Sequence, residues 1–289
     1  MHYKKVKGIL SSNNGMNIYR GCTNGCIYCD SRSKCYHINH DFEDVEVKSN
    51  AVDLLEEKLK SKRKKSMIGT GSMTDPYIHL ESEIANTHKC LEIIEKYGFG
   101  VTIITKSNLI LKDLDLLKRI NEKAKCVVQI TLTTFNEELC KIIEPNVSTT
   151  KERFEVLKIM RDNGIPTVVW LSPILPFIND NEENIRGLLN YCKEADVWGI
   201  LCFGMGMTLR EGNREYFYKK LDEHFPGLKE KYIAKYGDSY VINSPNTKKL
   251  MGIFREECSK NNIVYNTKEI FEFIGELPES DVQLNLFDF

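Results

Sequence analysis

Apolar runs of strand length alternate with amphipathic stretches through most of this chain. Buried parallel strands are near-continuous runs of Val, Ile and Leu, whereas surface helices repeat their apolar residues with a helical period. This pattern predicts strands at 16–19, 67–70, 99–105, 126–133, 166–171 and 197–203. It predicts helices at 49–64, capped by Ser49 or Asn50, and then at 81–97, 112–123, 149–163 and 181–193.

This alternation predicts an α/β fold in which a parallel sheet curls into a partial barrel. After residue 205 the pattern becomes helical, with helices predicted at 212–225, 229–236 and 247–261. We therefore expect a partial barrel over 1–205, a helical C-terminal appendage over 206–275 and a mobile tail over 276–289.

Three cysteines follow the first predicted strand with the spacing C-x3-C-x2-C: Cys22, Cys26 and Cys29. Thiolates this close on one loop converge on one metal centre. A closed zinc site uses four protein ligands, whereas a reactive centre keeps one position open. Two interpretations follow. One is a four-iron four-sulfur cluster with one open iron, and the other is a zinc knuckle completed by Cys35, His37 or His40.

Composition narrows the class of protein and its compartment. The 289 residues include 40 Lys and Arg against 41 Asp and Glu, a net charge of −1, which is not the basic balance of a protein that relies on phosphate contacts alone. No signal-peptide pattern or apolar run of about 18 residues is seen, which predicts a cytoplasmic protein with no membrane span. The ten cysteines are then expected to be thiols rather than disulfides.

A polar row on one predicted strand indicates a ligand cavity. Gln129, Thr131 and Thr133 share one face of the strand at 126–133. Barrel interiors are normally filled by branched apolar residues, so a polar inward face suggests a bound ligand, and Thr131 is the expected contact. In the alternative arrangement Ile130 and Leu132 point inward and the polar row faces the helices.

Four segments resemble the radical SAM superfamily, in the family's order, and within it the branch related to spore photoproduct lyase, also described as DNA repair photolyase-like. They are Tyr19-Arg-Gly-Cys-Thr-Asn-Gly-Cys-Ile-Tyr-Cys-Asp-Ser-Arg-Ser33, Gly69-Thr-Gly-Ser-Met-Thr-Asp-Pro-Tyr77, Glu144-Pro145 with Arg153, and Ser172-Pro-Ile-Leu-Pro-Phe-Ile-Asn-Asp180. The resemblance implies an open (β/α)6 TIM-type barrel and a 4Fe-4S cluster on Cys22, Cys26 and Cys29. It also implies reductive cleavage of S-adenosyl-L-methionine (SAM) to a 5′-deoxyadenosyl radical, with electrons from a flavodoxin- or ferredoxin-type protein.

The resemblance also implies roles for residues at the ends of strands. Tyr28 is expected near the adenine of SAM, and the loop Ser72, Met73, Thr74 and Asp75 near its amino group. Lys106 is expected to pair with the SAM carboxylate, Thr131 to contact SAM, and Ile174 to offer its backbone to adenine. Arg153 is expected either to support the carboxylate or to lie on a helix surface, the simpler interpretation.

Two departures argue against the lyase reaction itself. Ser72 stands where the lyase has a hydrogen-donating cysteine, and Asp30 follows the third cluster cysteine where the lyase has a tyrosine. We therefore expect a radical SAM enzyme of this branch with another substrate, acting on nucleic acid in DNA repair or modification. The alternatives are radical modification of a small molecule or protein, and a non-catalytic zinc-bearing nucleic-acid-binding module.

The last residues resemble a partner-binding peptide. Gln283, Leu284, Leu286 and Phe287 match the pentapeptide with which many bacterial DNA-transacting proteins bind the sliding clamp, in which apolar anchors enter pockets on the partner. A tail folded back on its own body is the alternative. The basic run at 58–65 is predicted to be a solvated helix end, because cations are favourable there.

Overall fold

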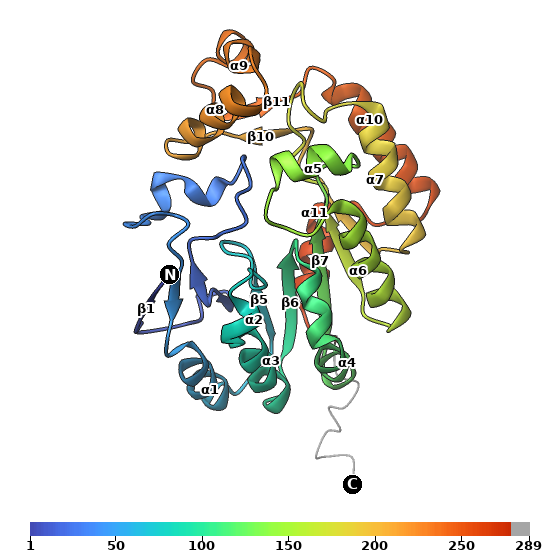
Figure 1. The fold of residues 1–289 in the computed structure, drawn as a ribbon. Coiled ribbons are helices and arrows are strands. Elements are labelled where there is room, and N and C mark those ends of the chain that lie inside the picture. Colours follow the sequence, from blue (N-terminus) through green and yellow to red (C-terminus); the bar gives the residue numbers. More distant parts are fainter. Residues whose placement is uncertain (279–289) are drawn as a thin grey trace.

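The computed structural model describes residues 1–278, and its centre is a parallel sheet of six strands in the order β2-β5-β6-β7-β8-β9 (Figure 1). The strands are β2 (Gly15–Met16), β5 (Met67–Thr70), β6 (Gly100–Thr105), β7 (Cys126–Thr131), β8 (Thr167–Trp170) and β9 (Gly199–Leu201). Every neighbouring pair is parallel, and within the described residues β2 and β9 do not pair with each other. The predicted open α/β barrel is confirmed.

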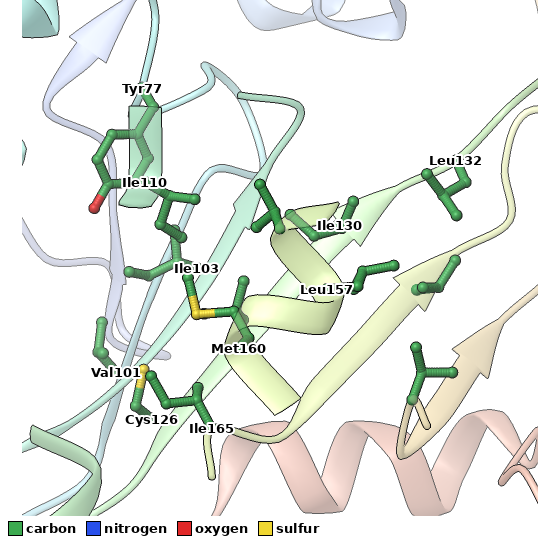
Figure 2. Packing of buried hydrophobic residues seen from close by; sticks show 14 of the residues in the cluster. Tyr77, Val101, Ile103, Ile110, Cys126, Ile130, Leu132, Leu157, Met160 and Ile165 are labelled. Carbon is green, nitrogen blue, oxygen red and sulfur yellow. The ribbon is translucent and has the colours of Figure 1, made fainter. Parts of the chain in front are cut away.

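Helices cover the outer face of this sheet. The main ones are α1 (Ala51–Ser61), α3 (Asn86–Lys96), α4 (Leu114–Lys123), α6 (Thr150–Asp162) and α7 (Glu182–Glu194), and the short α5 (Glu137–Ile143) precedes α6. Figure 2 shows Ile103 and Ile130 on the strands beside Leu157 and Met160 of α6, all in one buried cluster. A capping box starts α6. The Thr149 hydroxyl accepts from the backbone amide of Glu152, and the Glu152 carboxylate accepts from the backbone amide of Thr149.

The inner face of the barrel is partly polar and is plugged from below by the last helix. Because Ile130 and Leu132 pack in the outer cluster, Gln129 and Thr131 point inward, which excludes the alternative arrangement of this strand. Below them, inward residues of four strands pack against α11 (Thr267–Gly275): Met67, Val127, Val168 and Leu201 contact Ile270 and Ile274. The C-terminal helix thus forms the barrel floor.

Two elements differ from the sequence prediction. The first predicted strand is divided between two sheets, since β2 pairs with β5 while β3 (Tyr19–Arg20) pairs with β4 (Glu46–Lys48). The helix predicted at 81–97 breaks at Ala85, whose φ is +53°, into α2 (Glu81–Ile84) and α3. The Glu81 carboxylate explains this break, because it accepts from the amides of Thr87 and His88 and so caps α3.

Short strands at the N-terminus were not predicted. β1 (His2–Lys4) pairs in parallel with β4, and β4 pairs antiparallel with β3. Runs of two or three residues carry too little alternation to be recognised in a sequence. Asn50 is the N-cap residue of α1, as expected, but its side chain bonds both backbone groups of Val6 instead of capping the helix.

The chain after residue 205 contributes to three regions. Above the barrel lie α8 (Asn213–His224), α9 (Leu228–Tyr236) and an unpredicted antiparallel pair, β10 (Gly206–Thr208) with β11 (Val241–Asn243) (Figure 1). α10 (Thr247–Lys260) packs along α7, and α11 returns to the barrel floor. The domain boundary near 205 stays a prediction. The peptide at Gln283, Leu284, Leu286 and Phe287 lies outside the described residues.

Candidate functional site

A cavity of about 520 Å³ opens at the carboxyl ends of the strands. Ligand sites of parallel barrels lie at this end because the loops after successive strands meet there. Its walls come from the cysteine loop, the loop after β5, the ends of β6, β7 and β8, and the pair β10–β11. The residues that line it include Cys22, Cys26, Tyr28, Cys29, Asp30, Ser72, Met73, Asp75, Lys106, Thr131, Trp170 and Phe203.

The three motif cysteines share one wall of this cavity. Cys22 and Cys26 are buried, Cys29 is partly buried, and all three are free thiols. The backbone holds the loop, since the Cys22 amide donates to the Phe42 carbonyl at 2.8 Å and the Ile27 amide to that of Ile143 at 3.0 Å. Burial raises the pKa of the Cys22 thiol to about 12 and that of Cys26 further. A cationic centre is therefore required to hold these sulfurs as thiolates.

The arrangement of the three sulfur atoms can be compared with that of ligands to a single zinc ion. Ligands of one tetrahedral zinc lie about 4 Å apart, because zinc–sulfur bonds are about 2.3 Å long. Within residues 1–278, one group of three metal-binding side chains has its donor atoms within 4.8 Å of one another. It consists of His2, His40 and Asp44 and includes no cysteine. The three motif thiols share one cavity wall without forming such a group, and this arrangement fits a multi-iron cluster.

The expected fourth zinc ligands are not placed to complete a zinc knuckle. Cys35 is exposed, and its sulfur accepts from the Arg210 guanidinium at 3.3 Å. His37 is also exposed and sits in the left-handed backbone region. His40 belongs to the separate group with His2 and Asp44. None of these three candidates lines the cavity.

Tyr28 belongs to a buried polar chain that sequence reasoning did not predict. Its hydroxyl donates to the Glu144 carboxylate, which also pairs with the Arg153 guanidinium at 2.5 Å. Arg153 donates as well to the Thr131 carbonyl at 2.7 Å and is fully buried, so the expectation of a helix-surface arginine is wrong. Burial raises the pKa of Glu144, but Arg153 and then Lys106 outweigh it and hold the pKa below its usual range.

Lys106 directly follows β6 and lies on the cavity wall together with Ile104. Burial lowers the pKa of its ammonium group, but Cys26 and Glu144 outweigh that effect and raise it. Within residues 1–278 its Nζ forms no ion pair, and it lies 5.7 Å from the centre of the Tyr28 ring. A partly buried, charged and unpaired ammonium group on a cavity wall is suited to bind the carboxylate of a ligand.

The loop after β5 divides into lining residues and anchoring residues. Ser72 and Met73 line the cavity. Thr74 does not, because its hydroxyl donates to the Gly21 carbonyl at 2.9 Å. The Asp75 carboxylate accepts from the Asn24 amide, the Thr105 hydroxyl and the Lys106 backbone amide at 3.3, 2.7 and 2.8 Å. Asp75 thus ties the cysteine loop to the end of β6.

The remaining expected contacts lie at two levels of the barrel. Thr131 lines the cavity, and Gln129 below it donates to the Thr102 hydroxyl at 2.7 Å. Ile174 is fully buried and absent from the cavity wall, and its amide donates to the Gly206 carbonyl at 3.2 Å.

Several lining residues were not predicted from the sequence. Trp170 shares the inward face of β8 with Val168, and its Nε1 donates to Gln129 at 2.7 Å; strand alternation was a signal for it. Thr208, Val241 and Asn243 reach the cavity from β10 and β11, which no sequence pattern predicted.

Residues 16–192 match the family model described as the radical SAM superfamily, which covers more than half of the chain. The chain belongs to the radical SAM superfamily. Membership supports cleavage of SAM at an iron–sulfur cluster, with electrons from an external reductant. Within the described residues of this radical SAM protein, every helix is too short or too polar to cross a bilayer.

Relatives of this radical SAM protein include an uncharacterized protein of Mycobacterium tuberculosis, 27% identical over 76% of this chain and 66% of its own length. An uncharacterized protein of Methanocaldococcus jannaschii is 34% identical over 58% of this chain and 62% of its own. The chain thus aligns with somewhat less than two thirds of the length of these relatives. A third relative, from Pseudomonas phage M6, is named radical SAM Nalpha-GlyT isomerase and is 22% identical over 56% of this chain and 33% of its own.

Solved structures share the fold. A spore photoproduct lyase variant with bound AdoMet and dinucleoside spore photoproduct has a TM-score of 0.59 and 15% identity, over 86% of this chain and 73% of its own. The radical SAM methyltransferase TsrM of Kitasatospora setae, with cobalamin and a [4Fe-4S] cluster bound, has a TM-score of 0.50 and 16% identity, over 68% and 34%.

Proposed function

We propose that this protein holds a 4Fe-4S cluster on Cys22, Cys26 and Cys29 and cleaves SAM reductively to act on a further substrate. One observation supports this most directly: the three motif thiols, two of them buried, open onto the same cavity as a charged, unpaired lysine. When bound, the cluster supplies the electron that breaks a carbon–sulfur bond of SAM and yields a 5′-deoxyadenosyl radical.

The cavity residues have separate roles toward SAM in this proposal. Lys106 binds the carboxylate, since its ammonium group is charged, free of ion pairs among the described residues and faces the cavity. Ser72 and Met73 border the amino group, while Tyr28 and Thr131 form the wall along the nucleoside. Thr74 and Asp75 act as positioning residues, because their polar atoms are engaged with Gly21, Asn24 and Thr105.

Ile174 also has a positioning role in this proposal. Its amide is already bonded to Gly206, at the start of β10, so it joins the loop after β8 to the C-terminal part of the cavity. Replacement of Gly206 by Ala tests this role, since an added Cβ would lie 2.2 Å from the Ile242 carbonyl. We expect that variant to weaken SAM binding without loss of iron.

The ligand assignment is tested by anaerobic reconstitution. Wild-type protein is expected to be brown and to contain iron and sulfide, while Cys26→Ala loses both. Cys90→Ala is the matched control, because Cys90 is equally buried but packs in the outer core cluster. Full iron content in Cys26→Ala, or zinc in place of iron in the wild type, would refute the assignment.

The substrate we favour is nucleic acid, modified or repaired by a reaction other than that of spore photoproduct lyase. The motif resemblance to the lyase branch supports nucleic acid as the substrate class. The clamp-like peptide at Gln283–Phe287 supports DNA in particular. Against the lyase reaction itself, Ser72 lines the cavity where a thiol donor is required. Within the described residues, the cysteines that line the cavity are the three proposed cluster ligands.

A radical isomerisation is a second candidate, favoured by the same lack of a spare thiol. An isomerase returns the abstracted hydrogen to its product and needs no outside hydrogen donor. One relative is named as an isomerase, which supports the comparison. The candidates are distinguished by the amount of SAM consumed per product when reduced enzyme and SAM are incubated with DNA and then without it. An isomerase consumes far less than one SAM per product, whereas a reaction that uses SAM as co-substrate consumes one each time.

A further inference from the structure

Three side chains with metal-binding atoms gather at the N-terminal edge of the molecule, outside the cavity. One donor atom from each of His2, His40 and Asp44 lies within 4.8 Å of the other two. His2 belongs to β1, whereas His40 and Asp44 lie in the segment between the cysteine loop and β4. None of the three lines the cavity described above.

The imidazole of His40 is prepared to bind a cation. Its Nδ1 lies 2.9 Å from the Asp41 carbonyl oxygen, which only accepts, so Nδ1 carries the proton and Nε2 presents a lone pair. That Nε2 is buried and has no hydrogen-bond partner in the described residues. A buried acceptor without a partner costs free energy that a bound ion removes. Metal-binding histidines are oriented by this kind of bond from their other nitrogen.

His2 and Asp44 supply the other donors. His2 Nδ1 lies 2.9 Å from Asp44 Oδ2, and the rings of His2 and His40 pack edge to face with centres 4.8 Å apart. An ordinary ion pair accounts for His2 and Asp44 but leaves His40 unexplained. The neighbouring charges are the Met1 amino group, 2.9 Å from Asp44 Oδ1, and the buried Glu46, 3.8 Å from His2 Nε2 and paired with Lys4.

The loop that carries His40 is fixed to the cysteine loop. The Arg20 guanidinium donates to the carbonyls of Tyr36 and His37 at 2.7 and 2.8 Å. The His40 ring packs against Gly21, where a Cβ would lie 3.5 Å from the imidazole and 2.5 Å from the Phe42 carbonyl oxygen. Donors held by such contacts lose little entropy when an ion binds.

We propose that His2, His40 and Asp44 bind one divalent transition-metal ion of the zinc class, with water in the remaining position. Two imidazoles and one carboxylate suit Zn²⁺, and Co²⁺ binds the same donors. The ion replaces the proton shared by His2 and Asp44 and joins β1 to the segment before β4. The site is separate from the proposed iron–sulfur cluster, because none of its three donors lines the cavity.

Metal content of the reconstituted full chain tests this proposal. After exposure to Zn²⁺ and removal of the excess, wild-type protein is expected to retain about one zinc ion per chain. His40→Ala and Asp44→Asn are expected to lose the zinc while their iron content is unchanged. His37→Ala is the matched control, because His37 is a nearby exposed histidine outside the group, and it retains the zinc. Equal zinc in all four proteins would overturn the site.

A second measurement tests the site if the His40→Ala variant folds poorly. If His40→Ala also loses iron, His40→Gln is compared with wild type by titration with Co²⁺, after the three motif cysteines are replaced by alanine in both. The wild-type background is expected to give the visible bands of Co²⁺ bound to nitrogen and oxygen, and His40→Gln to bind at least tenfold more weakly. Identical titrations would overturn the proposal whatever the iron content.

Discussion

The Arg153 guanidinium lies 2.5 Å from a carboxylate oxygen of Glu144, and both side chains are completely buried. Glu144 also accepts from the Tyr28 hydroxyl, and Arg153 donates to the Thr131 carbonyl. Tyr28 and Thr131 both line the cavity. This ion pair therefore fixes two walls of the cavity, at the ends of different elements.

Loss of one partner of this pair is expected to destabilise the protein strongly. Arg153→Met leaves the Glu144 carboxylate buried without its cation, which costs about 3–5 kcal/mol. The double variant Arg153→Met with Glu144→Gln is expected to recover much of that loss, because no buried charge remains. Urea unfolding of both measures it, and a double variant less stable than Arg153→Met would contradict this account.

The same pair predicts a pH dependence of stability. The folded pKa of Glu144 lies below its ordinary value of 4.5, so its stabilisation is present above that value and is lost as pH falls through the folded pKa. The free energy of unfolding of the wild type is thus expected to fall more steeply below about pH 4.5 than that of Glu144→Gln. Parallel curves for the two proteins would show that Glu144 carries no depressed pKa.

Lys106→Met is expected to weaken SAM binding while the cluster stays intact. Loss of a charge-assisted bond of about 1.5–3 kcal/mol raises the dissociation constant roughly 10- to 150-fold. Lys112→Met, which removes an exposed lysine outside the cavity lining, is the control. The dissociation constant of SAM is measured for both variants by equilibrium binding. Equal affinities would show that Lys106 does not bind SAM.

Gly71→Ala is expected to disrupt the loop that carries Ser72 and Met73. Gly71 has a φ of +99°, and a Cβ there would lie 2.0 Å from the Ile104 carbonyl oxygen. Strain and clash together are expected to cost at least about 2 kcal/mol and to abolish SAM binding. Gly252→Ala, in α10 with open space around it, is expected to leave both properties unchanged or to stabilise the helix. Thermal unfolding with and without SAM measures both.

The clamp-like peptide gives a prediction that is independent of the cluster. Chemical crosslinking to a bacterial sliding clamp is expected for the wild type and expected to be lost when Leu286 and Phe287 are both replaced by alanine, because these are the apolar anchors. Ser280→Ala, upstream in the same tail, is the control. Crosslinking that persists after the double replacement would show that the peptide does not bind the clamp through Leu286 and Phe287.

The sequence predicted the barrel because its buried strands are long apolar runs. It also predicted the inward polar face of β7, since strand alternation places Gln129 and Thr131 opposite Ile130. The division of the first strand between two sheets could not be predicted, because segments of two residues have no period. The break at Ala85 depends on the side chain of Glu81, which acts through a bond that no local pattern encodes.

In the candidate site, too, local features were predictable from the sequence and long-range contacts were not. Cys22, Cys26 and Cys29 were found because their spacing is local. The Glu144–Arg153 pair was not predicted, since an arginine on an amphipathic helix looks solvent-exposed until tertiary packing brings a carboxylate to it. Residues of β10 and β11 joined the cavity only through a long-range fold-back, so Asn243 and Val241 carried no signal.

Formation of 5′-deoxyadenosine tests the central claim most directly. Anaerobically reconstituted wild-type protein, given SAM and a strong reductant, is expected to release 5′-deoxyadenosine and methionine in equal amounts, and Cys26→Ala to release neither. Iron-replete wild-type protein that takes up electrons yet forms no 5′-deoxyadenosine, with or without DNA, would contradict the account. So would product formation by Cys26→Ala at the wild-type rate.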